Sequence, residues 1–359
     1  MNTERRTDTA LRDEQREQTG LALAGMLIPV FFATLFATCI IGAYHKPHPN
    51  SIKVGVVGPA AQTAALRAGL VKAAGSAFAI SQVPTVAEAA HAVRERGLTA
   101  AYVPTADPKH PATVIVASAG GRLAATAAET LARAVTTQQG TQLVVQEVRP
   151  LASGDEIGLG VFMLLIICTI CGYLAPTVLE QAAPALRPSR RYTLFAASAV
   201  LVPTIVYLIG GLGYGTYTGS AETILAVIGV AALYTFSIGL GTRLLQVLLG
   251  PPAIFVSLTI LVFLNIASLG ATYTSNMLSP FWRFLNHYWI GAGTVNAERS
   301  LLYFGSQGIA TDLLRLFAWT AVIVAFLVLP VSRTLERRRE HPVEAPAFMP
   351  PAPQLLREP

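Results

Sequence analysis

The hydrophobic positions of the chain fall into six long runs that are almost free of charged residues. A helix needs roughly 20 apolar residues to cross the hydrocarbon core of a bilayer, and the runs are close to that length. We therefore predict six transmembrane helices, at Leu21–Tyr44, Ile157–Leu179, Thr193–Leu212, Ile224–Leu240, Ala253–Ala271 and Leu313–Val331. Only the last run contains a charge, Arg315, which we interpret as an anchor that extends toward the nearer end of its helix.

The first run follows a polar segment, residues 1–20. It is longer than the roughly 7–15 apolar residues of a secretory signal peptide, which favours an uncleaved membrane anchor over a cleaved leader. At the other end of the chain, residues 334–359 are rich in proline, and we predict a disordered tail. Residues 156–333 form the predicted five-helix membrane domain.

Basic residues indicate how the helices are oriented. The short connection after the second run carries Arg187, Arg190 and Arg191, and the junction after the fourth run carries Arg243. The opposite connection, 213–222, has no Lys or Arg. Because short cytoplasmic loops of membrane proteins are enriched in Lys and Arg, we predict that both termini are cytoplasmic in a multi-pass plasma-membrane protein.

Residues 45–155 separate the first two apolar runs and have a different pattern. Short β-branched runs alternate there with helical stretches, and Thr85 followed by Glu88 is typical of a capped helix start. Strands are expected at 52–57, 78–83, 100–104, 113–118 and 142–148, and helices at 60–74, 85–97 and 120–139. The predicted fold class is an α-helical polytopic membrane protein with a small extracytoplasmic α/β domain inserted between transmembrane helices 1 and 2.

The connection before the last run, 273–312, is polar but contains many aromatic residues. Aromatic and basic residues together are typical of the membrane–water interface. We predict a short interfacial or re-entrant helix at 280–290, with a plain extracellular loop as the alternative. Its candidate interfacial residues are Trp282, Arg283, Tyr288 and Trp289.

Composition and motifs narrow the function classes. Charged residues make up 13% of the chain and the net charge is +6, but the basic residues cluster at the ends of apolar runs, so a membrane protein is favoured over a nucleic-acid-binding one. The sequence has no GxxxxGK[ST], HExxH or GxSxG motif, so neither an enzyme nor a cofactor or metal site is expected. The one clear polar residue inside a run is Asn265, a candidate for function or for an interhelical hydrogen bond.

Three stretches carry a family resemblance: IKVGVVGP after the first run, VAEAAHAVRERGLTAAYVP at 86–104, and LSPFWRFLNHYWIGAGTVNAERSLLYFG at 278–305. Together with the order of one span, a large insert and five spans, they resemble the membrane subunits of type-2 ABC exporters, in particular the phage infection protein (YhgE/Pip) branch. The proline pair of that family's PPGA motif is replaced here by Trp289 and Ile290, and the insert is compact.

The resemblance implies a bacterial permease subunit that dimerises, with itself or with a related permease, and exports a substrate using an ATPase on a separate chain. In this family the ATPase docks on a short cytoplasmic helix between the second and third spans. The matching segment here is EQAAPALRPSRR, with Arg187, Arg190 and Arg191 as candidate docking residues, although a plain basic loop is also consistent with it. The alternative is a non-transport envelope protein whose insert binds a partner in assembly, adhesion or phage recognition.

Overall fold

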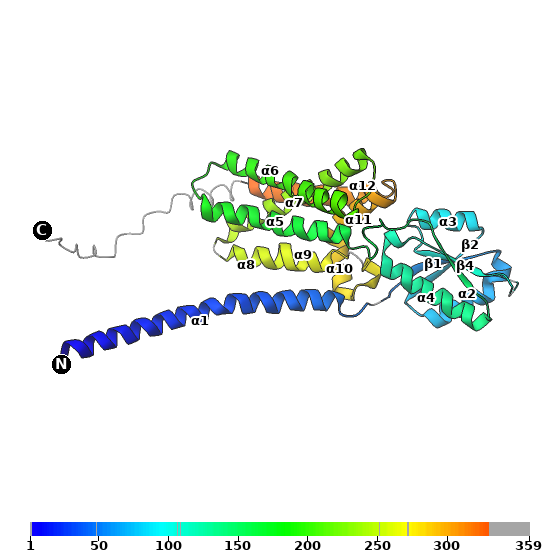
Figure 1. Cartoon of the computed structure of the whole chain (residues 1–359), viewed down its shortest axis with the longest axis horizontal. Helices are drawn as coiled ribbons and strands as arrows, with labels where there is room; N and C mark the ends of the chain where they lie inside the picture. Colours follow the sequence, from blue (N-terminus) through cyan, green and yellow to red (C-terminus); the bar gives the residue numbers. More distant parts are fainter. Residues whose placement is uncertain are drawn as a thin grey trace.

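The chain forms a bundle of helices with an α/β domain at one end (Figure 1). The computed structural model describes residues 2–329 except 48, 106, 108, 251, 271 and 272, so the predicted tail at 334–359 lies outside the described residues. We call the end of the bundle that adjoins the α/β domain the domain end, and the other the free end. The bundle helices are α1 (Asn2–Tyr44), α5 (Gly160–Ala182), α6 (Pro188–Tyr207), α7 (Ala221–Leu249), α8 (Ala253–Ser257), α9 (Asn265–Ser268), α10 (Pro280–Tyr288), α11 (Ile290–Tyr303) and α12 (Ile309–Val328).

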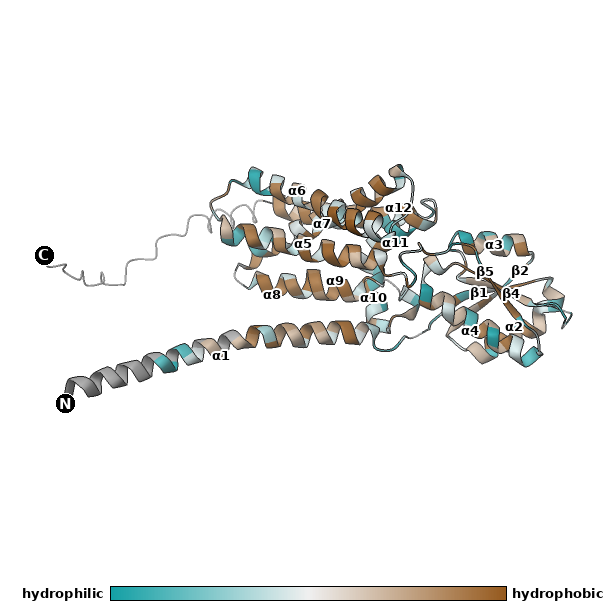
Figure 2. Ribbon diagram, viewed as in Figure 1, coloured by the Kyte–Doolittle hydropathy of each residue, from teal (hydrophilic) through white to brown (hydrophobic). Residues whose placement is uncertain are grey.

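Five of the described helical segments are long and apolar enough to cross a membrane. They are Met26–Tyr44 of α1, α5, α6 with the π-helical η2 (Leu208–Gly213), α7, and α12, and Figure 2 shows their hydrophobic residues as a continuous band. This arrangement defines a helical polytopic membrane protein. Five of the six predicted spans are thus confirmed as long apolar helices. The remaining one, predicted at 253–271, forms a shorter helix, Ala253–Ser268, whose middle is the π-helix η3 (Leu258–Leu264).

Helices α5 and α7 lie at the centre of the bundle. In the most apolar stretch of each helix, 50% of α5 and 56% of α7 is buried. The corresponding buried share is 11% for α1, 17% for α6 and 11% for α12. The outer helices therefore present large hydrophobic side chains, such as Leu27, Leu201 and Phe317, that are exposed among the described residues. In water such surfaces would be unfavourable, but lipid tails solvate them without cost, so lipid is the solvent that this surface requires.

The α/β domain contains a five-stranded sheet with the strand order β2-β1-β3-β4-β5. Strand β1 pairs in parallel with β2 and β3, β3 pairs antiparallel with β4, and β4 pairs in parallel with β5. The strands are β1 (Ile52–Val57), β2 (Phe78–Val83), β3 (Ala100–Val103), β4 (Ala112–Val116) and β5 (Leu143–Glu147), and the helices are α2 (Ala60–Ala74), α3 (Val86–Arg94) and α4 (Arg122–Gln139). Every strand and helix predicted between residues 52 and 148 is confirmed, within a few residues at the ends.

Local chemistry explains the limits of these helices. The hydroxyl of Thr85 accepts a hydrogen bond from the Glu88 amide at 3.2 Å and so caps α3, as the sequence predicts. Gly140 ends α4 in the left-handed conformation, which costs glycine no side-chain clash. The small alanines of α4 pack on one face of the sheet, and those of α3 pack on the other.

Two side chains from the membrane half complete the two cores of the α/β domain. Met277, in the 3₁₀ turn η4 (Ser275–Met277), packs with the residues under α4, and Phe304, which follows α11, packs with the residues under α3. Both are at least 96% buried, with exposures of 4% and 1%. The amide of Asn50 also donates to the carbonyl of Asn276 at 2.9 Å. The domain is therefore firmly attached to the bundle, and isolating residues 45–155 would open both cores.

The connection predicted as a loop with one short helix contains two helices. The first, α10, lies where a short helix was predicted, and α11 follows it after a single residue, Trp289. Helix α11 is too short to span a bilayer, yet it packs against α5, α7, α9 and α12 and reaches the α/β domain at its carboxyl end. Sequence reasoning missed α11 because its residues are small and polar rather than continuously apolar.

Candidate functional site

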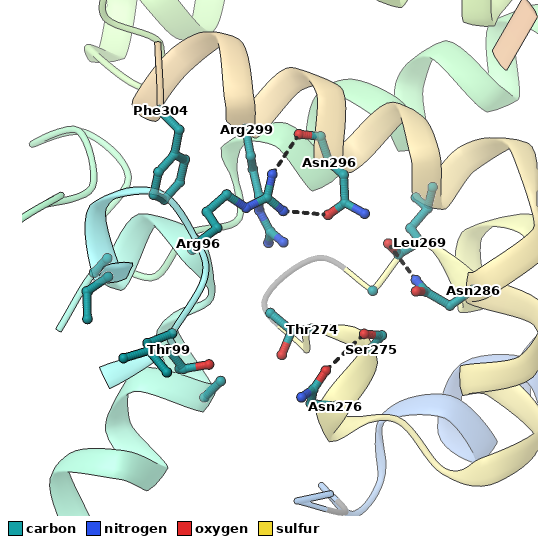
Figure 3. A pocket seen from close by; sticks show the side chains of 16 residues that line it. Arg96, Thr99, Leu269, Thr274, Ser275, Asn276, Asn286, Asn296, Arg299 and Phe304 are labelled. Atoms are coloured by element: carbon teal, nitrogen blue, oxygen red, sulfur yellow. Dashed lines mark hydrogen bonds between the residues drawn. The ribbon is translucent and has the colours of Figure 1, made fainter. Parts of the chain in front are cut away.

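A polar cavity of about 210 Å³ lies at the junction between the α/β domain and the domain end of the bundle, and we call it the junction cavity. Its walls come from α3 and the segment after it, from residues 117–124, from residues 269–270 and 274–276, from α10 and from α11. The described residues that line it include two arginines, Arg96 and Arg299, and no acidic side chain. Figure 3 shows the two guanidinium groups next to each other, one from each half of the molecule.

Arg96 is held across the junction by three hydrogen bonds. Its Nη1 donates to the Ser300 hydroxyl at 2.8 Å and to the Asn296 carbonyl at 3.5 Å, and its Nη2 donates to Asn296 Oδ1 at 3.1 Å. The guanidinium carbon lies 5.4 Å from the centre of the Phe304 ring, within range of a cation–π contact. These partners are neutral. Burial, the larger effect, lowers the pKa of Arg96, while the carboxylate that acts on its charge, that of Asp312, raises this pKa.

Arg299 lies on α11 directly before Ser300, and its exposed fraction is 6%. Burial and the nearby charge of Arg96 lower its pKa to about 10, while Tyr303 and Asp155 act in the opposite direction. Asp155 does not line the cavity. Its two carboxylate oxygens accept hydrogen bonds from the amides of Leu159 and Gly160, at 2.7 and 3.0 Å, and so cap the start of α5.

Glu298 lies one residue before Arg299 but faces the interior of the bundle. Its side chain is fully buried, and neither carboxylate oxygen has a hydrogen-bond partner within the described part of the chain. Burial raises the pKa of this carboxyl group well above its usual range. A buried acid without a partner is stable only when it is neutral, so Glu298 holds a proton in this conformation.

Asn265 forms the interhelical hydrogen bonds that the sequence left as one of two alternatives. Its Nδ2 donates to the Tyr234 hydroxyl at 2.6 Å and lies 3.5 Å from Thr169 Oγ1, while Thr169 and Tyr234 are 2.6 Å apart. The network joins α9, α7 and α5 in the centre of the bundle. It satisfies the amide Nδ2 of Asn265 and the hydroxyl groups of Thr169 and Tyr234, while Asn265 Oδ1 is buried without a hydrogen-bond partner in the described part of the chain.

The aromatic residues of α10 divide between two environments. Trp282 is buried beside Gly42 of α1, and Arg283 donates to the carbonyl groups of Ser275 and Leu278 at 3.3 and 2.9 Å. Trp289, just beyond the helix, packs against Trp319 of α12 with ring centres 5.8 Å apart. Of the four candidate interfacial residues, only Tyr288 is largely exposed; the exposed face of α10 is completed by Phe281 and Phe284.

The three candidate docking residues do not form one surface. Arg187 and Arg190 are exposed, but Arg191 is 3% exposed and donates to Glu180 at 3.1 Å. Arg243 of α7 donates to the same carboxylate oxygen at 2.7 Å. Arg191 therefore joins the free ends of α5, α6 and α7 and is not available to a partner. No separate helix occurs between Ala182 and Pro188, where the resemblance implied one.

Sequence reasoning missed Arg96, Glu298 and Arg299. One signal was present: Glu298 and Arg299 are the only charged residues between Arg283 and Asp312. An isolated acid–base pair in an otherwise uncharged segment that adjoins a membrane helix indicates buried charge. Arg96 had no such signal, because it follows Arg94 and Glu95 in a segment that reads as an ordinary solvated helix end.

Comparison with protein-family models, with curated proteins and with solved structures finds no match. The described residues also contain no group of three or more His, Cys, Asp or Glu side chains that could hold a metal ion. The structure alone therefore gives the class of protein: a polytopic helical membrane protein with an attached α/β domain. A positively charged cavity lies between the helical bundle and this domain.

Proposed function

We propose that this chain is the membrane permease subunit of an exporter, driven by an ATPase on a separate chain, with the α/β domain outside the cell and both termini in the cytoplasm. The order of one anchor, an α/β insert and a helical membrane domain supports this, as does the resemblance of residues 52–59, 86–104 and 278–305 to type-2 ABC exporters. The exposed Arg187 and Arg190 at the free end of the bundle fit the cytoplasmic side. In this reading the sixth span is the short helix at 253–268, in a locally thinned bilayer.

The observation that carries the proposal is the helix pair α10–α11. Helices that enter a membrane domain without crossing it are found where a protein lines a cavity, and in transporters they form the substrate and gating elements. Here α11 carries the buried Glu298 and Arg299 and contacts both the central helices and the α/β domain. A rigid connection through Arg96 and Phe304 would transmit movement of this pair to the outer domain.

Docking of the ATPase is assigned to the free ends of α5 and α6. Arg187 and Arg190 are the two exposed cations there, whereas changing Arg191 would remove a partner of Glu180. Dimerisation, with a second copy or a related permease, completes the proposed transporter. The exposed apolar faces of the outer helices leave room for it.

Two measurements test this function with the full chain. The first is co-purification from membranes of an ATPase, which we expect to be lost in the double variant Arg187→Glu/Arg190→Glu. The matched control changes two exposed arginines of the α/β domain, Arg122→Glu/Arg133→Glu, and should retain the ATPase. Equal binding by both double variants would remove the docking segment from the proposal.

The second measurement places the two halves of the molecule relative to the bilayer. Single cysteines at Ser189 and at Thr130, in a variant without the three native cysteines, should react with a membrane-impermeant reagent from opposite sides of sealed vesicles. Reaction from the same side would refute the topology. Retained topology without ATP-dependent flux would favour the alternative, an envelope protein whose domain binds a partner.

A further inference from the structure

The junction cavity has the composition of an anion-binding site. The described residues of its wall provide two guanidinium groups, hydroxyl groups and amide groups, but no carboxylate. Proteins rarely enclose two cations of like charge in one small space, because the repulsion is unfavourable in a poorly solvated environment. We propose that the junction cavity binds a phosphate-type oxyanion between Arg96 and Arg299.

The backbone of Arg96 directs its side chain into the junction cavity. Its φ angle is +62°, in the left-handed region that a residue with a long side chain rarely adopts. This conformation turns the side chain away from the end of α3 and across the junction, where Asn296 and Ser300 hold it. The left-handed conformation closes α3, since the amides of Gly97 and Arg96 donate to the carbonyl groups of Ala92 and Val93, and it brings the guanidinium group of Arg96 beside that of Arg299 (Figure 3).

The opposite wall adds neutral donors. Thr274 lines the cavity, and its hydroxyl oxygen is buried without a hydrogen-bond partner in the described part of the chain. Ser275 and Thr99 also line the cavity, with the Ser275 hydroxyl donating to Asn276 Oδ1 at 3.1 Å. An anion with oxygens in a tetrahedral arrangement can accept hydrogen bonds from several directions at once, whereas a planar carboxylate would use fewer of these donors. Guanidinium groups also match phosphate oxygens in geometry.

Size and position restrict the ligand. A volume of about 210 Å³ accommodates a phosphate group with a few waters, but it is smaller than the roughly 300–1,000 Å³ of pockets that enclose whole drug-sized ligands. The cavity lies where α11 and the segment after α9 meet the α/β domain, at the end of the membrane helices. The phosphate group can therefore belong to a lipid-like amphiphile or to a free anion, and this inference does not depend on whether the chain transports anything.

The test measures phosphate binding to the purified full chain in neutral detergent. Sodium phosphate should raise the unfolding temperature relative to sodium chloride at equal ionic strength, and calorimetric titration should give a dissociation constant. Arg96→Gln should weaken binding by about tenfold or more, as expected for the loss of a charged hydrogen-bond donor. Arg94→Gln, which removes the same charge from an exposed position two residues earlier, should leave binding within about twofold.

A second variant keeps the test decisive if Arg96→Gln does not fold. Thr274→Val preserves the volume of the side chain and removes only the unpaired hydroxyl group, so it should fold and bind phosphate several-fold more weakly. To distinguish the sources, the chain is placed in nanodiscs of phosphatidylcholine with and without phosphatidic acid. Stabilisation by phosphatidic acid alone identifies a lipid headgroup, and stabilisation by inorganic phosphate identifies a free anion. No effect of either probe, or equal losses in the Arg94 and Arg96 variants, would overturn the proposal.

Discussion

Glu298 offers the sharpest test of the structure, because its burial predicts how stability depends on pH. The carboxyl group is protonated in the folded state, and in the unfolded chain it ionises near its ordinary pKa of about 4.3. Between that value and the raised pKa of the folded state, the folded protein binds one proton more than the unfolded chain. Stability is therefore lost as the pH rises through this interval, by about 1.4 kcal/mol per pH unit.

The perturbation is Glu298→Gln, which keeps the shape of the side chain but cannot ionise. We compare its free energy of unfolding with that of the wild type between pH 5 and pH 7, using denaturant titrations in detergent. Over these two units the wild type should lose stability relative to the variant, by at most about 3 kcal/mol. The buried Asp155 also has a raised pKa, but it is present in both proteins, so its contribution cancels in the comparison.

The matched control is Glu222→Gln, a change of the same chemistry at an exposed position in the first turn of α7. Its pH profile should run parallel to that of the wild type. Parallel profiles for wild type and Glu298→Gln as well would refute the reasoning, because they would mean that Glu298 is ionised and solvated in the folded protein.

Three further predictions follow from contacts in the structure. Glu180→Gln should reduce the free energy of unfolding by about 1–3 kcal/mol in denaturant titrations, because Glu180 is the ion-pair partner of two buried arginines. The loss should be smaller than for a fully buried ion pair, since the Glu180 side chain is 45% exposed. Phe304→Ala should cost about 3–5 kcal/mol and accelerate hydrogen exchange in β3 and β4, whereas Phe281→Ala, at an exposed position, should do neither. Tyr234→Phe should lower the unfolding temperature through a loss of about 1–3 kcal/mol, because it leaves the amide of Asn265 without its 2.6 Å acceptor.

The α/β domain could be predicted from the sequence almost completely, and the reason is periodicity. Strands such as 52–57 are β-branched and bounded by glycine and proline, and the helix at 86–94 has its cap residue in place. The five long apolar helices were predictable for a related reason, because crossing a bilayer requires a length of uncharged sequence that little else requires. In both cases one local property decides the structure.

The candidate site was not predictable in this way, because it depends on contacts between distant segments. Arg96 meets Asn296 and Ser300 across about 200 positions of sequence, and no local pattern marks such a pair. Arg191 was misjudged for the same reason: in the sequence it is one of three similar arginines, and only the fold brings it to Glu180. Helix α11 was missed because other helices surround it on several sides. A helix in that position needs no amphipathic pattern, so its sequence did not show one.

The positions of the buried polar and charged residues indicate which part of the bundle would control a movement of its helices. The centre of the bundle contains the network of Asn265, Tyr234 and Thr169, which is neutral and closely hydrogen-bonded. At the domain end, by contrast, α11 buries a carboxyl group without a partner beside two neighbouring guanidinium groups. Ionisation of Glu298 requires water or a polar partner beside it, and α11 would have to shift against the helices that it packs on, α5, α7, α9 and α12. Because Arg96 is hydrogen-bonded to Asn296 and Ser300 of α11, such a displacement would be passed on to the α/β domain. Movement of α11 and movement of the α/β domain are therefore expected to be coupled.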